Sequence, residues 1–274
     1  MKNLNSYFKD KVVIVTGASS GIGLASARLL GSLGACVVMA ARSYDRLCEL
    51  TGSVAPADRV LAVRCDVTRE ADCSSLVQST LQRFGRIDIL VNNAGISMRA
   101  MFRDLDLSVL HRLMDVNFWG TVNCTKFALP HLLQARGQVV GVISVAGFSA
   151  LPARTGYSAS KYAVRGFLDT LRMEHLKEGL GVLVFAPGYT ASNVRNAALT
   201  ADGTPQGATP LDEDKLMSAE DCAMHLASAL ARRRSEVVLT PLGKATVWAH
   251  RLFPRLTDRL TYSYIARETD SPYK

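Results

Sequence analysis

A glycine-rich turn placed between a buried strand and a helix constrains the fold of this chain more than any other feature. Residues 12–15 are a short β-branched run, typical of a strand buried on both faces. Residues 16–23 follow with the sequence TGASSGIG, and an apolar repeat at helical spacing comes next. A strand, a glycine turn and a helix in this order are typical of a site that binds a dinucleotide.

The same alternation of strand and helix continues along the chain. Strands are predicted at residues 12–15, 36–40, 60–65, 87–91, 139–144, 182–186 and 236–240. Helices are predicted at residues 24–33, 46–50, 72–83, 106–133, 157–177 and 218–231. Repeated βαβ units predict a single-domain α/β fold over residues 1–274, a Rossmann-type doubly wound parallel sheet with helices on both faces and a C-terminal helical extension.

Composition favours an ordinary globular protein, with 48% hydrophobic and 20% charged residues. The six cysteines form no Cys-x-x-Cys pair and the five histidines no His-Glu-x-x-His motif, so we expect no metal site. A cysteine nucleophile also lacks its local signature. Residues 1–11 are short and polar, without a secretory signal, which predicts a reducing, cytoplasmic setting without disulfides.

The net charge of +8 is concentrated near the C-terminus, where residues 232–274 hold nine Lys/Arg against four Asp/Glu. A basic surface suits nucleic acid, anionic membranes or phosphorylated ligands, although a solvated basic face is the simpler interpretation. Because no nucleic-acid-binding motif accompanies the charge, we expect no nucleic-acid partner. No run of about 18 apolar residues predicts a membrane-spanning helix.

The glycine turn has a physical role at each position. Gly17 permits the tight turn, while Gly21 and Gly23 let backbone and cofactor approach closely. The helix N-terminus offers free N–H groups to a pyrophosphate, and neighbouring serines add hydroxyl donors. The expected cofactor contacts of this turn are Gly17, Ser19, Ser20, Gly21, Ile22 and Gly23. A plain strand–helix turn is the alternative interpretation.

The end of the second strand predicts which cofactor is bound. A carboxylate there binds the adenosine ribose of NAD, whereas an arginine accommodates the 2′-phosphate of NADP. Arg42 occupies this place without a carboxylate, which predicts NADP(H); Arg46 is a second candidate or a solvated helix residue. Asp66, followed by Val67, ends the third strand and suits the adenine amino group, or else caps the next helix.

A tyrosine and a lysine four residues apart form the candidate acid–base pair. Tyr157 and Lys161 share one face of a predicted helix, where the ammonium favours the phenolate. We therefore expect the pKa of Tyr157 to lie below 10, as a general acid–base requires. Ser144 lies thirteen residues before Tyr157. Taken alone, a Tyr-x-x-x-Lys spacing arises by chance on many helices.

Together these segments resemble the short-chain dehydrogenase/reductase family. The resemblance covers about residues 11–192. It rests on residues 16–23, the NNAG segment 92–95, the DVNFWG segment 115–120, Ser144 with Tyr157 and Lys161, and Pro187 with Gly188. Residues 187–190 and 200–203 also resemble the subgroup of membrane-associated reductases of lipid, steroid and retinoid carbonyls.

The resemblance implies a catalytic set of four residues. Tyr157 would protonate a carbonyl oxygen in reduction or deprotonate an alcohol in oxidation, and Lys161 would lower its pKa and bind the nicotinamide ribose. Ser144 would hold the substrate oxygen, and Asn117 a water that links Lys161 to solvent. Ser144 could instead cap a strand end, and Asn117 could bridge helix backbone.

The resemblance also implies cofactor and substrate contacts. Cofactor contacts are expected at Asn93, Ala94, Gly95, Tyr157, Lys161, Pro187, Gly188, Thr190 and Ser192. Substrate contacts are expected at Ser144, Ala146, Phe148, Leu151, Arg154, Tyr157 and Tyr189, beneath a lid at about residues 189–217. This mostly apolar set favours a hydrophobic carbonyl or secondary alcohol, although Arg154 allows an anionic one.

The C-terminal extension, residues 241–274, carries an apolar repeat. Trp248, Leu252, Leu256, Leu260 and Tyr264 recur every four residues, with Arg251, Arg255 and Arg259 beside them. Pro254 would break or start a helix. Such a stretch can lie on an anionic membrane or pack on the body as a lid or dimer element; we favour packing, since most amphipathic stretches face their own core.

The sequence thus predicts an NADP(H)-dependent oxidoreductase that acts on a small-molecule carbonyl or alcohol. Two alternatives stay open: a catalytically silent NADP(H)-binding sensor or scaffold, and a peripheral membrane protein that uses its basic C-terminal segment. The family resemblance also suggests a homodimer or homotetramer formed through helices around residues 106–133 and 157–177.

Overall fold

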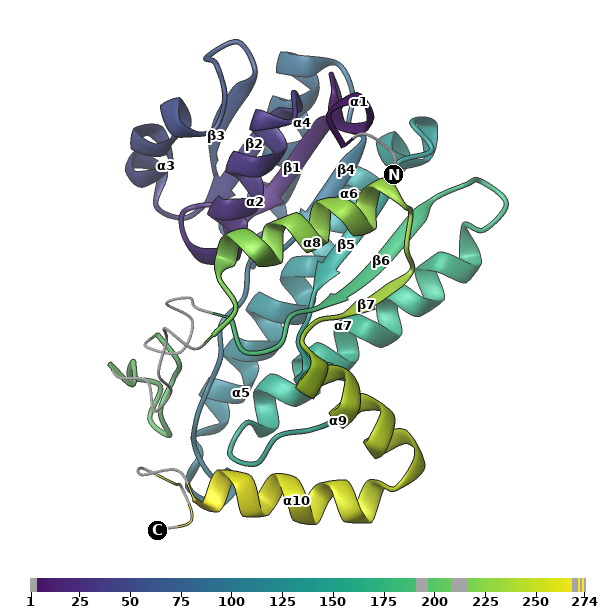
Figure 1. The fold of residues 1–274 in the computed structure, drawn as a ribbon. Coiled ribbons are helices and arrows are strands. Elements are labelled where there is room, and N and C mark those ends of the chain that lie inside the picture. The colour runs from purple at the N-terminus through teal and green to yellow at the C-terminus, as the bar shows by residue number, and fades with distance from the viewer. Residues whose placement is uncertain (1–3, 191–196, 208–215, 268–270, 272, 274) are drawn as a thin grey trace.

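One parallel sheet of seven strands organises the chain in a computed structural model, which describes residues 4–190, 197–207, 216–267, 271 and 273 (Figure 1). The strands are β1 Val12–Thr16, β2 Cys36–Ala41, β3 Val60–Arg64, β4 Ile89–Asn92, β5 Gln138–Val142, β6 Gly181–Ala186 and β7 Glu236–Val238. Their order across the sheet is β3-β2-β1-β4-β5-β6-β7. The order reverses between β1 and β4, where open α/β sheets bind their ligands.

Helices connect consecutive strands, one more precedes β1, and two follow β7. They are α1 Leu4–Phe8, α2 Gly21–Ser32, α3 Tyr44–Leu50, α4 Glu70–Phe84, α5 Leu107–Leu113, α6 Gly120–Gln134, α7 Thr155–Glu174, α8 Ala219–Ala231, α9 Pro241–Leu252 and α10 Pro254–Ala266. The single helix predicted at 106–133 contains a π-helical segment, Met114–Trp119, between α5 and α6. The sequence pattern does not mark this widened turn, because the apolar spacing continues through it.

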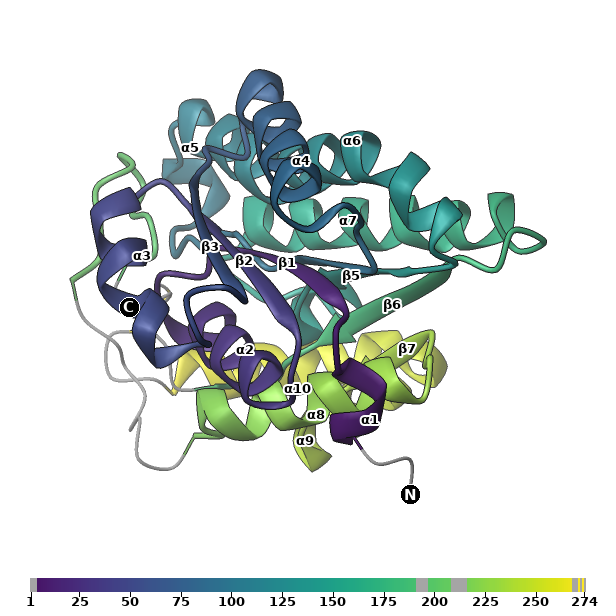
Figure 2. The ribbon, with the colours of Figure 1, turned by 90° about the horizontal axis from the view of Figure 1, so that it is seen from above.

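The strands bury alternate residues against helices on the two sides of the sheet. Val13 and Val15 of β1 belong to one core cluster, which includes residues of α2 and α8, and Ile14 belongs to the other, with residues of α4, α6 and α7. Figure 2 shows these two helical layers above and below the sheet. The predicted doubly wound parallel fold is therefore confirmed.

The N-terminal helix α1 is an element that the sequence pattern did not reveal. Its last residue, Phe8, is completely buried and joins the core cluster that contains α2 and α8. The neighbouring Tyr7 accepts a hydrogen bond of 2.5 Å from the side chain of Gln138, at the start of β5. Five residues are too few for a helical repeat to be recognised, and only tertiary contacts stabilise a helix this short.

The C-terminal extension forms a pair of packed helices, and Pro254 starts the second of them, α10. The apolar repeat is not buried against the body of its own chain, since Trp248, Leu252 and the rest of the repeat are exposed, whereas packing as a dimer element stays a prediction. The two helices instead bury Val247, Thr257 and Ile265. Among the described helices, none combines the length and apolar character that crossing a bilayer requires.

Candidate active site

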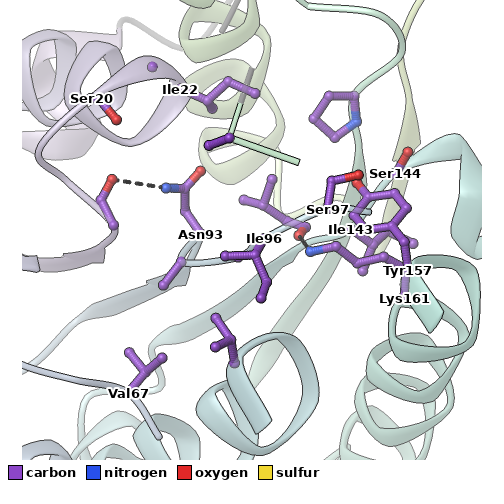
Figure 3. Close-up of a pocket in the computed structure, with 18 of the residues that line it drawn as sticks. Ser20, Ile22, Val67, Asn93, Ile96, Ser97, Ile143, Ser144, Tyr157 and Lys161 are labelled. Atoms are coloured by element: carbon purple, nitrogen blue, oxygen red, sulfur yellow. Dashed lines mark hydrogen bonds between the residues drawn. The ribbon is translucent and has the colours of Figure 1, made fainter. Parts of the chain in front are cut away.

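A pocket of about 410 Å³ lies along the carboxyl ends of the central strands. It extends from the start of α2, around Ser20 and Ile22, to the side chains of Ser144, Tyr157 and Lys161 (Figure 3). This is the crevice in which doubly wound sheets bind dinucleotides.

The glycine turn is tied to the end of β4 by hydrogen bonds. The hydroxyl oxygen of Thr16 accepts the backbone N–H groups of Asn93 and Ala94, both at 3.0 Å, and Asn93 donates its side-chain amide to the Thr16 carbonyl at 2.9 Å. Gly17 has φ of +65°, and a Cβ there would lie 2.9 Å from the Cα of Ala94. Only glycine therefore fits where the two strand ends meet.

Gly23 serves the turn rather than the pocket. It does not line the pocket, and a Cβ there would lie 2.3 Å from the carbonyl oxygen of Gly17. The glycine thus allows α2 to pack closely on the turn that precedes it, and the cofactor contact expected at Gly23 stays a prediction. The other five expected residues of the turn, Gly17, Ser19, Ser20, Gly21 and Ile22, line the pocket.

The N-terminus of α2 faces this pocket. Ser20, the N-cap residue, has an extended backbone and makes no side-chain capping hydrogen bond. The first N–H groups of a helix lack intrahelical acceptors and lie at the positive end of the helix dipole. With the hydroxyls of Ser19 and Ser20, this end of the pocket fits a pyrophosphate group.

An arginine occupies the end of β2. Arg42 is exposed at the rim of the pocket, next to Ser43, and its backbone carbonyl accepts a hydrogen bond of 3.4 Å from Nε of Arg64. The second candidate, Arg46, instead forms an ion pair of 2.8 Å with Glu49 and does not line the pocket, consistent with a solvated helix residue. Arg42 thus lines this end of the pocket, and Arg64 does not.

Asp66 and Val67 line the pocket beyond the end of β3. One carboxylate oxygen of Asp66 accepts two hydrogen bonds from Thr68, at 3.1 Å from its backbone nitrogen and 2.8 Å from its hydroxyl. These bonds close a local turn before α4, whose N-cap residue is Arg69 and has no side-chain capping bond, so Asp66 does not take the alternative role of capping this helix. The expected contact with an adenine amino group stays a prediction.

Tyr157 and Ser144 meet at the other end of the pocket. Burial raises the pKa of the Tyr157 phenol above the ordinary value of 10.0, while a hydrogen bond with Ser144 and the positive charge of Arg154 act in the opposite direction. The expectation that Lys161 brings this pKa below 10 is thus corrected. Desolvation of a buried phenolate outweighs the neighbouring groups, so the phenol keeps its proton near neutral pH.

Lys161 is buried one helical turn further along α7. Its Nζ donates a hydrogen bond to the carbonyl oxygen of Val142 at 2.9 Å and lies 5.8 Å from the centre of the Tyr157 ring. Burial lowers the pKa of Lys161 to about 8. The ammonium is therefore held by backbone at the pocket wall rather than by a carboxylate.

Asn117 lies in the π-helical segment, where α-helical geometry is interrupted. Its side-chain oxygen accepts the Ile96 N–H at 2.8 Å, and its nitrogen donates to the Ile96 carbonyl at 3.0 Å and to the Ser160 hydroxyl at 2.9 Å. This buried amide thus ties the chain after β4 to α7, and the backbone that it bonds, at Ile96, is not the helix backbone considered as the alternative. It does not itself line the pocket, and the water expected between Lys161 and solvent stays a prediction.

Five of the seven predicted substrate contacts line the pocket: Ser144, Leu151, Arg154, Tyr157 and Tyr189. Ala146 and Phe148 do not line it, and their contacts with a substrate stay predictions. Phe148 is buried in the core, and its ring centre lies 4.1 Å from the Arg165 guanidinium. Ala146 lies in a short 3-10 turn, Val145–Gly147, that follows Ser144, and Phe148 comes directly after this turn.

The family of short chain dehydrogenases matches residues 11–202, which is more than half of the chain. This chain belongs to the short-chain dehydrogenase/reductase family. Dehydrogenase/reductase SDR family member 7B of Rattus norvegicus is 34% identical over 97% of this chain and 85% of its own. The 11-beta-hydroxysteroid dehydrogenase-like protein 4A of Arabidopsis thaliana is 37% identical over 90% of this chain and 82% of its own. These names agree with the subgroup that the sequence indicates.

Solved structures of family members have the same fold. A short-chain dehydrogenase/reductase of Burkholderia phymatum in complex with NAD superimposes with a TM-score of 0.81 at 25% identity, over 91% of this chain and 96% of that one. An alcohol dehydrogenase of Thermococcus sibiricus complexed with 5-hydroxy-NADP gives a TM-score of 0.74 at 24% identity, over 84% and 96%. The present short-chain dehydrogenase/reductase is an NAD(P)-dependent oxidoreductase.

The remaining predicted cofactor contacts lie after the ends of two strands, β4 and β6. Asn93, Ala94 and Gly95 line the pocket from the β4 end, and Pro187, Gly188 and Thr190 from the β6 end, whereas Ser192 lies outside the described residues. Within the predicted lid, Leu199 and Ala201 form backbone hydrogen bonds with Ser97, Arg99 and Asp106, and Ala197 lines the pocket.

Sequence reasoning missed several lining residues of this short-chain dehydrogenase/reductase: Ala41, Ser43, Cys65, Ile96, Ser97, Val116, Val142, Ile143 and Ala197. Most of them are direct neighbours of predicted residues at strand ends. Strand ends that share an edge bring their following residues together, so the residues adjacent to Arg42 and Gly95 could have been included. Val116 and Ala197 carry no such signal, because a π-helical turn and a folded-back segment bring them to the pocket.

Proposed function

We propose that this protein is an NADP(H)-dependent oxidoreductase acting on the carbonyl or secondary alcohol of a hydrophobic small molecule. One observation carries the proposal: a single pocket has the Ser144–Tyr157 pair at one end and the Arg42 guanidinium at the other. Acid–base chemistry and 2′-phosphate recognition are therefore separated along one crevice, as a dinucleotide lying in it requires.

The pocket residues fit a dinucleotide by their chemistry. The tight backbone approach at Gly17 leaves the crevice open where a Cβ would not fit, and the adjoining N-terminus of α2 offers N–H donors. Gly95 also lies close to its neighbours, since a Cβ there would lie 3.0 Å from the Asn117 side-chain oxygen and 3.3 Å from the Lys161 Nζ. The bound nicotinamide would supply or accept the hydride.

The protein's own groups would then handle the oxygen and its proton. Ser144 would hold the substrate oxygen, since its hydroxyl already lies at the phenol of Tyr157. Tyr157, whose raised pKa keeps it protonated, would donate its proton to a carbonyl oxygen in reduction. Lys161 would place a cation beside this pair and bind the nicotinamide ribose, and its pKa of about 8 allows it to exchange a proton near neutral pH.

The preference for NADP(H) is supported by the charges at the adenosine end. Arg42 and Arg64 are exposed near the end of β2, and Ser43 adds a hydroxyl at the pocket rim. Pocket residues 41–43 include no carboxylate that would repel a 2′-phosphate. Arginine groups bind phosphate strongly because they combine charge with a planar set of donors.

The preference for an apolar substrate is supported by the walls beside Tyr157. Ile143, Leu151 and Tyr189 line this part of the pocket. Arg154 also lines it, but its guanidinium donates to the Ser97 hydroxyl at 2.9 Å and to the Met98 carbonyl at 3.1 Å. Because these bonds hold Arg154 in place, we infer that its role is to order residues 97–98 rather than to bind an anionic substrate.

Cofactor titration of matched arginine variants tests the proposal. NADPH and NADH are titrated into wild type, Arg42→Ala and Arg46→Ala while cofactor fluorescence is followed. We expect wild type to prefer NADPH and Arg42→Ala to lose about 10- to 100-fold in NADPH affinity alone, as the loss of a charged phosphate contact implies. Arg46→Ala, which removes an equal charge bound to Glu49, should behave as wild type.

Three results would count against this function. Equal affinity of wild type for NADH would reject the cofactor preference, and an unchanged preference in Arg42→Ala would reject the role of that arginine. Tight NADPH binding without turnover across a panel of hydrophobic carbonyls would instead favour the silent sensor or scaffold. Tyr157→Phe, which keeps the ring and removes the proton, is the catalytic control.

The predicted homodimer or homotetramer is part of the same proposal. The helices expected to form it correspond to α5, the π-helical segment, α6 and α7, on which Trp119 and Met173 are exposed. Exposed aromatic and methionine side chains are enriched at subunit interfaces. Sedimentation of wild type beside Trp119→Ser tests this assignment, and an unchanged assembly in the variant would reject it.

A further inference from the structure

A second cation lies near the candidate acid–base, on the side opposite to Lys161 along the chain. Arg154 is the N-cap residue of α7 and precedes Tyr157 by less than one helical turn. The side chains of both residues line the same part of the pocket. The start of α7 therefore brings a guanidinium to the pocket wall that carries the phenol.

The guanidinium of Arg154 is held by residues 97–100, which we call the strap. It donates hydrogen bonds to the Ser97 hydroxyl at 2.9 Å and to the Met98 carbonyl oxygen at 3.1 Å. Both acceptor residues are buried, and Ser97 lines the pocket, as Tyr157 does (Figure 3). Because a guanidinium is planar and rigid, two such bonds fix its orientation as well as its place.

The strap is anchored to two distant parts of the chain. The backbone N–H of Ala100 donates to the Ala153 carbonyl oxygen at 3.0 Å. On its other side, the N–H of Leu199 donates to the Ser97 carbonyl oxygen at 2.9 Å, and the N–H of Arg99 donates to the Leu199 carbonyl oxygen at 2.8 Å. The acceptors of the Arg154 guanidinium are therefore themselves fixed in place.

Met98 connects the arginine to the phenol. Its carbonyl oxygen accepts from Arg154, and its side chain belongs to a buried apolar cluster against which Tyr157 packs. A Cβ at Gly156 would lie 3.3 Å from the Met98 sulfur, so the chain between the arginine and the tyrosine also passes close to Met98. The contacts of Met98 thus keep Arg154 and Tyr157 next to each other.

The two cations near Tyr157 respond differently to pH. The Lys161 Nζ lies 5.8 Å from the centre of the Tyr157 ring, and burial lowers the pKa of this lysine to about 8. Burial raises the pKa of Tyr157 above 10.0, while the Ser144 hydrogen bond and the charge of Arg154 act against burial. A guanidinium keeps its charge in alkaline solution. Arg154 is therefore the cation that persists where the phenolate forms.

We propose that Arg154 is a positioning residue of the reaction: the strap holds its charge beside Tyr157, where it stabilises the negative charge that the phenol oxygen acquires as its proton leaves. In carbonyl reduction, the O–H bond of Tyr157 breaks and the proton passes to the substrate oxygen, which leaves the phenolate. In alcohol oxidation, the phenolate takes the proton back. The inference rests on the acid–base role proposed above for Tyr157.

Alkaline titration of the tyrosinate absorbance tests this charge without turnover. Subtracting the spectrum of the matching Tyr157→Phe protein isolates one of the eight tyrosines. We expect Tyr157 to titrate at higher pH in Arg154→Gln than in wild type, because loss of a neighbouring cation disfavours the phenolate. Arg154→Lys, which keeps the charge but not the planar donor set, should titrate close to wild type. Circular dichroism at each pH shows whether each protein is folded.

Steady-state kinetics of the same two variants measure the effect on the reaction. We expect kcat/KM of Arg154→Gln for a hydrophobic carbonyl to fall about 3- to 10-fold, as the loss of one nearby charge in a partly solvated site implies. Arg154→Lys should recover most of this loss. The Kd for NADPH, measured by cofactor fluorescence, should stay close to the wild-type value in both variants.

Arg103→Gln is the matched control for general surface charge. Arg103 lies just beyond the strap, is exposed, forms an ion pair of 3.5 Å with Asp104 and does not line the pocket. Its removal takes away the same charge at a greater separation from the phenol. Both the titration of Tyr157 and kcat/KM should therefore be those of wild type.

Three outcomes would overturn the proposal. The first is a Tyr157 titration in Arg154→Gln at the wild-type pH. The second is the same change in Arg154→Gln and Arg154→Lys, which would assign the effect to lost packing rather than to charge. The third is an equal change in Arg103→Gln. Failure of the acid–base role is a separate result, since Tyr157→Phe would then keep its turnover while the titrations still report on the charge.

Discussion

Lys161 donates its hydrogen bond to the carbonyl oxygen of Val142, at 2.9 Å, across the junction between α7 and the end of β5. The lysine is almost completely buried. A buried ammonium that has one neutral acceptor loses more hydration than the acceptor replaces, which favours the uncharged amine. This relationship explains why the pKa of Lys161 falls to about 8.

Lys161 should therefore make the stability of the protein depend on pH. Folding releases its proton between the folded pKa of about 8 and the ordinary value of 10.5. Since the unfolded state binds more protons in this window, stability rises with pH there, by up to about 1.4 kcal/mol per unit. Urea unfolding of wild type and Lys161→Met measures this. As the pH rises through the window, the free energy of unfolding of wild type should increase relative to that of the variant. Parallel profiles would contradict the prediction.

Tyr157 should give the two reaction directions opposite dependences on pH. Its raised pKa keeps the phenol protonated at neutral pH, so carbonyl reduction should hold a plateau until the pH approaches that pKa. Alcohol oxidation needs the phenolate and should rise about tenfold per pH unit below it. Initial rates in both directions test this. Tyr157→Phe should lose at least about 10³-fold in turnover while retaining NADPH affinity, and an active variant would reject the role.

Gly23→Ala should damage the cofactor site from a distance. The new Cβ would lie 2.3 Å from the Gly17 carbonyl oxygen, so the turn must shift. We expect the free energy of unfolding to fall by about 2 kcal/mol or more, and NADPH to bind more weakly. Gly166→Ala on the exposed side of α7 is the matched control, because nothing lies within 4 Å of the new Cβ. The free energy of unfolding of this control should rise by about 0.5–1 kcal/mol, since alanine favours helix more than glycine does. Denaturant midpoints compare the two.

Asn117→Ala should destabilise the protein more than Asn123→Ala does. The first change removes three hydrogen bonds and leaves both backbone groups of Ile96 without these partners, which implies a cost of about 2–4 kcal/mol. The second removes one bond of 3.2 Å, to the Val67 carbonyl, and should cost about 1 kcal/mol. Equal unfolding free energies of the two variants would contradict the bridging role of Asn117.

The direction of the Tyr157 pKa illustrates what a sequence pattern leaves out. Helical spacing correctly places Lys161 one turn after Tyr157, and this predicted proximity suggested a more acidic phenol. Spacing along a helix says nothing about how deeply both groups are buried. In the folded protein, desolvation dominates the pKa of both groups, raising that of Tyr157 and lowering that of Lys161.

The apolar repeat of α9 and α10 shows the same limit in the opposite direction. Spacing predicted helices with one apolar stripe, and the helices are present. Which side faces the body depends on contacts that the pattern does not contain. In the folded protein, Val247 and Ile265 are buried, whereas Leu256 and Leu260 stay exposed.

The sequence by itself determined the parallel doubly wound fold, the glycine turn and the family, because each depends on local spacing: β-branched runs, a helical repeat, and residue types fixed at strand ends. Only the tertiary structure decided that Gly23 packs on Gly17, that Asn117 bridges Ile96 and Ser160, and that Phe148 enters the core. These outcomes depend on burial and on contacts between segments far apart in the chain. The free energy of these contacts depends on the water that is excluded when the segments come together. The spacing of residues along the sequence does not show which groups lose this water.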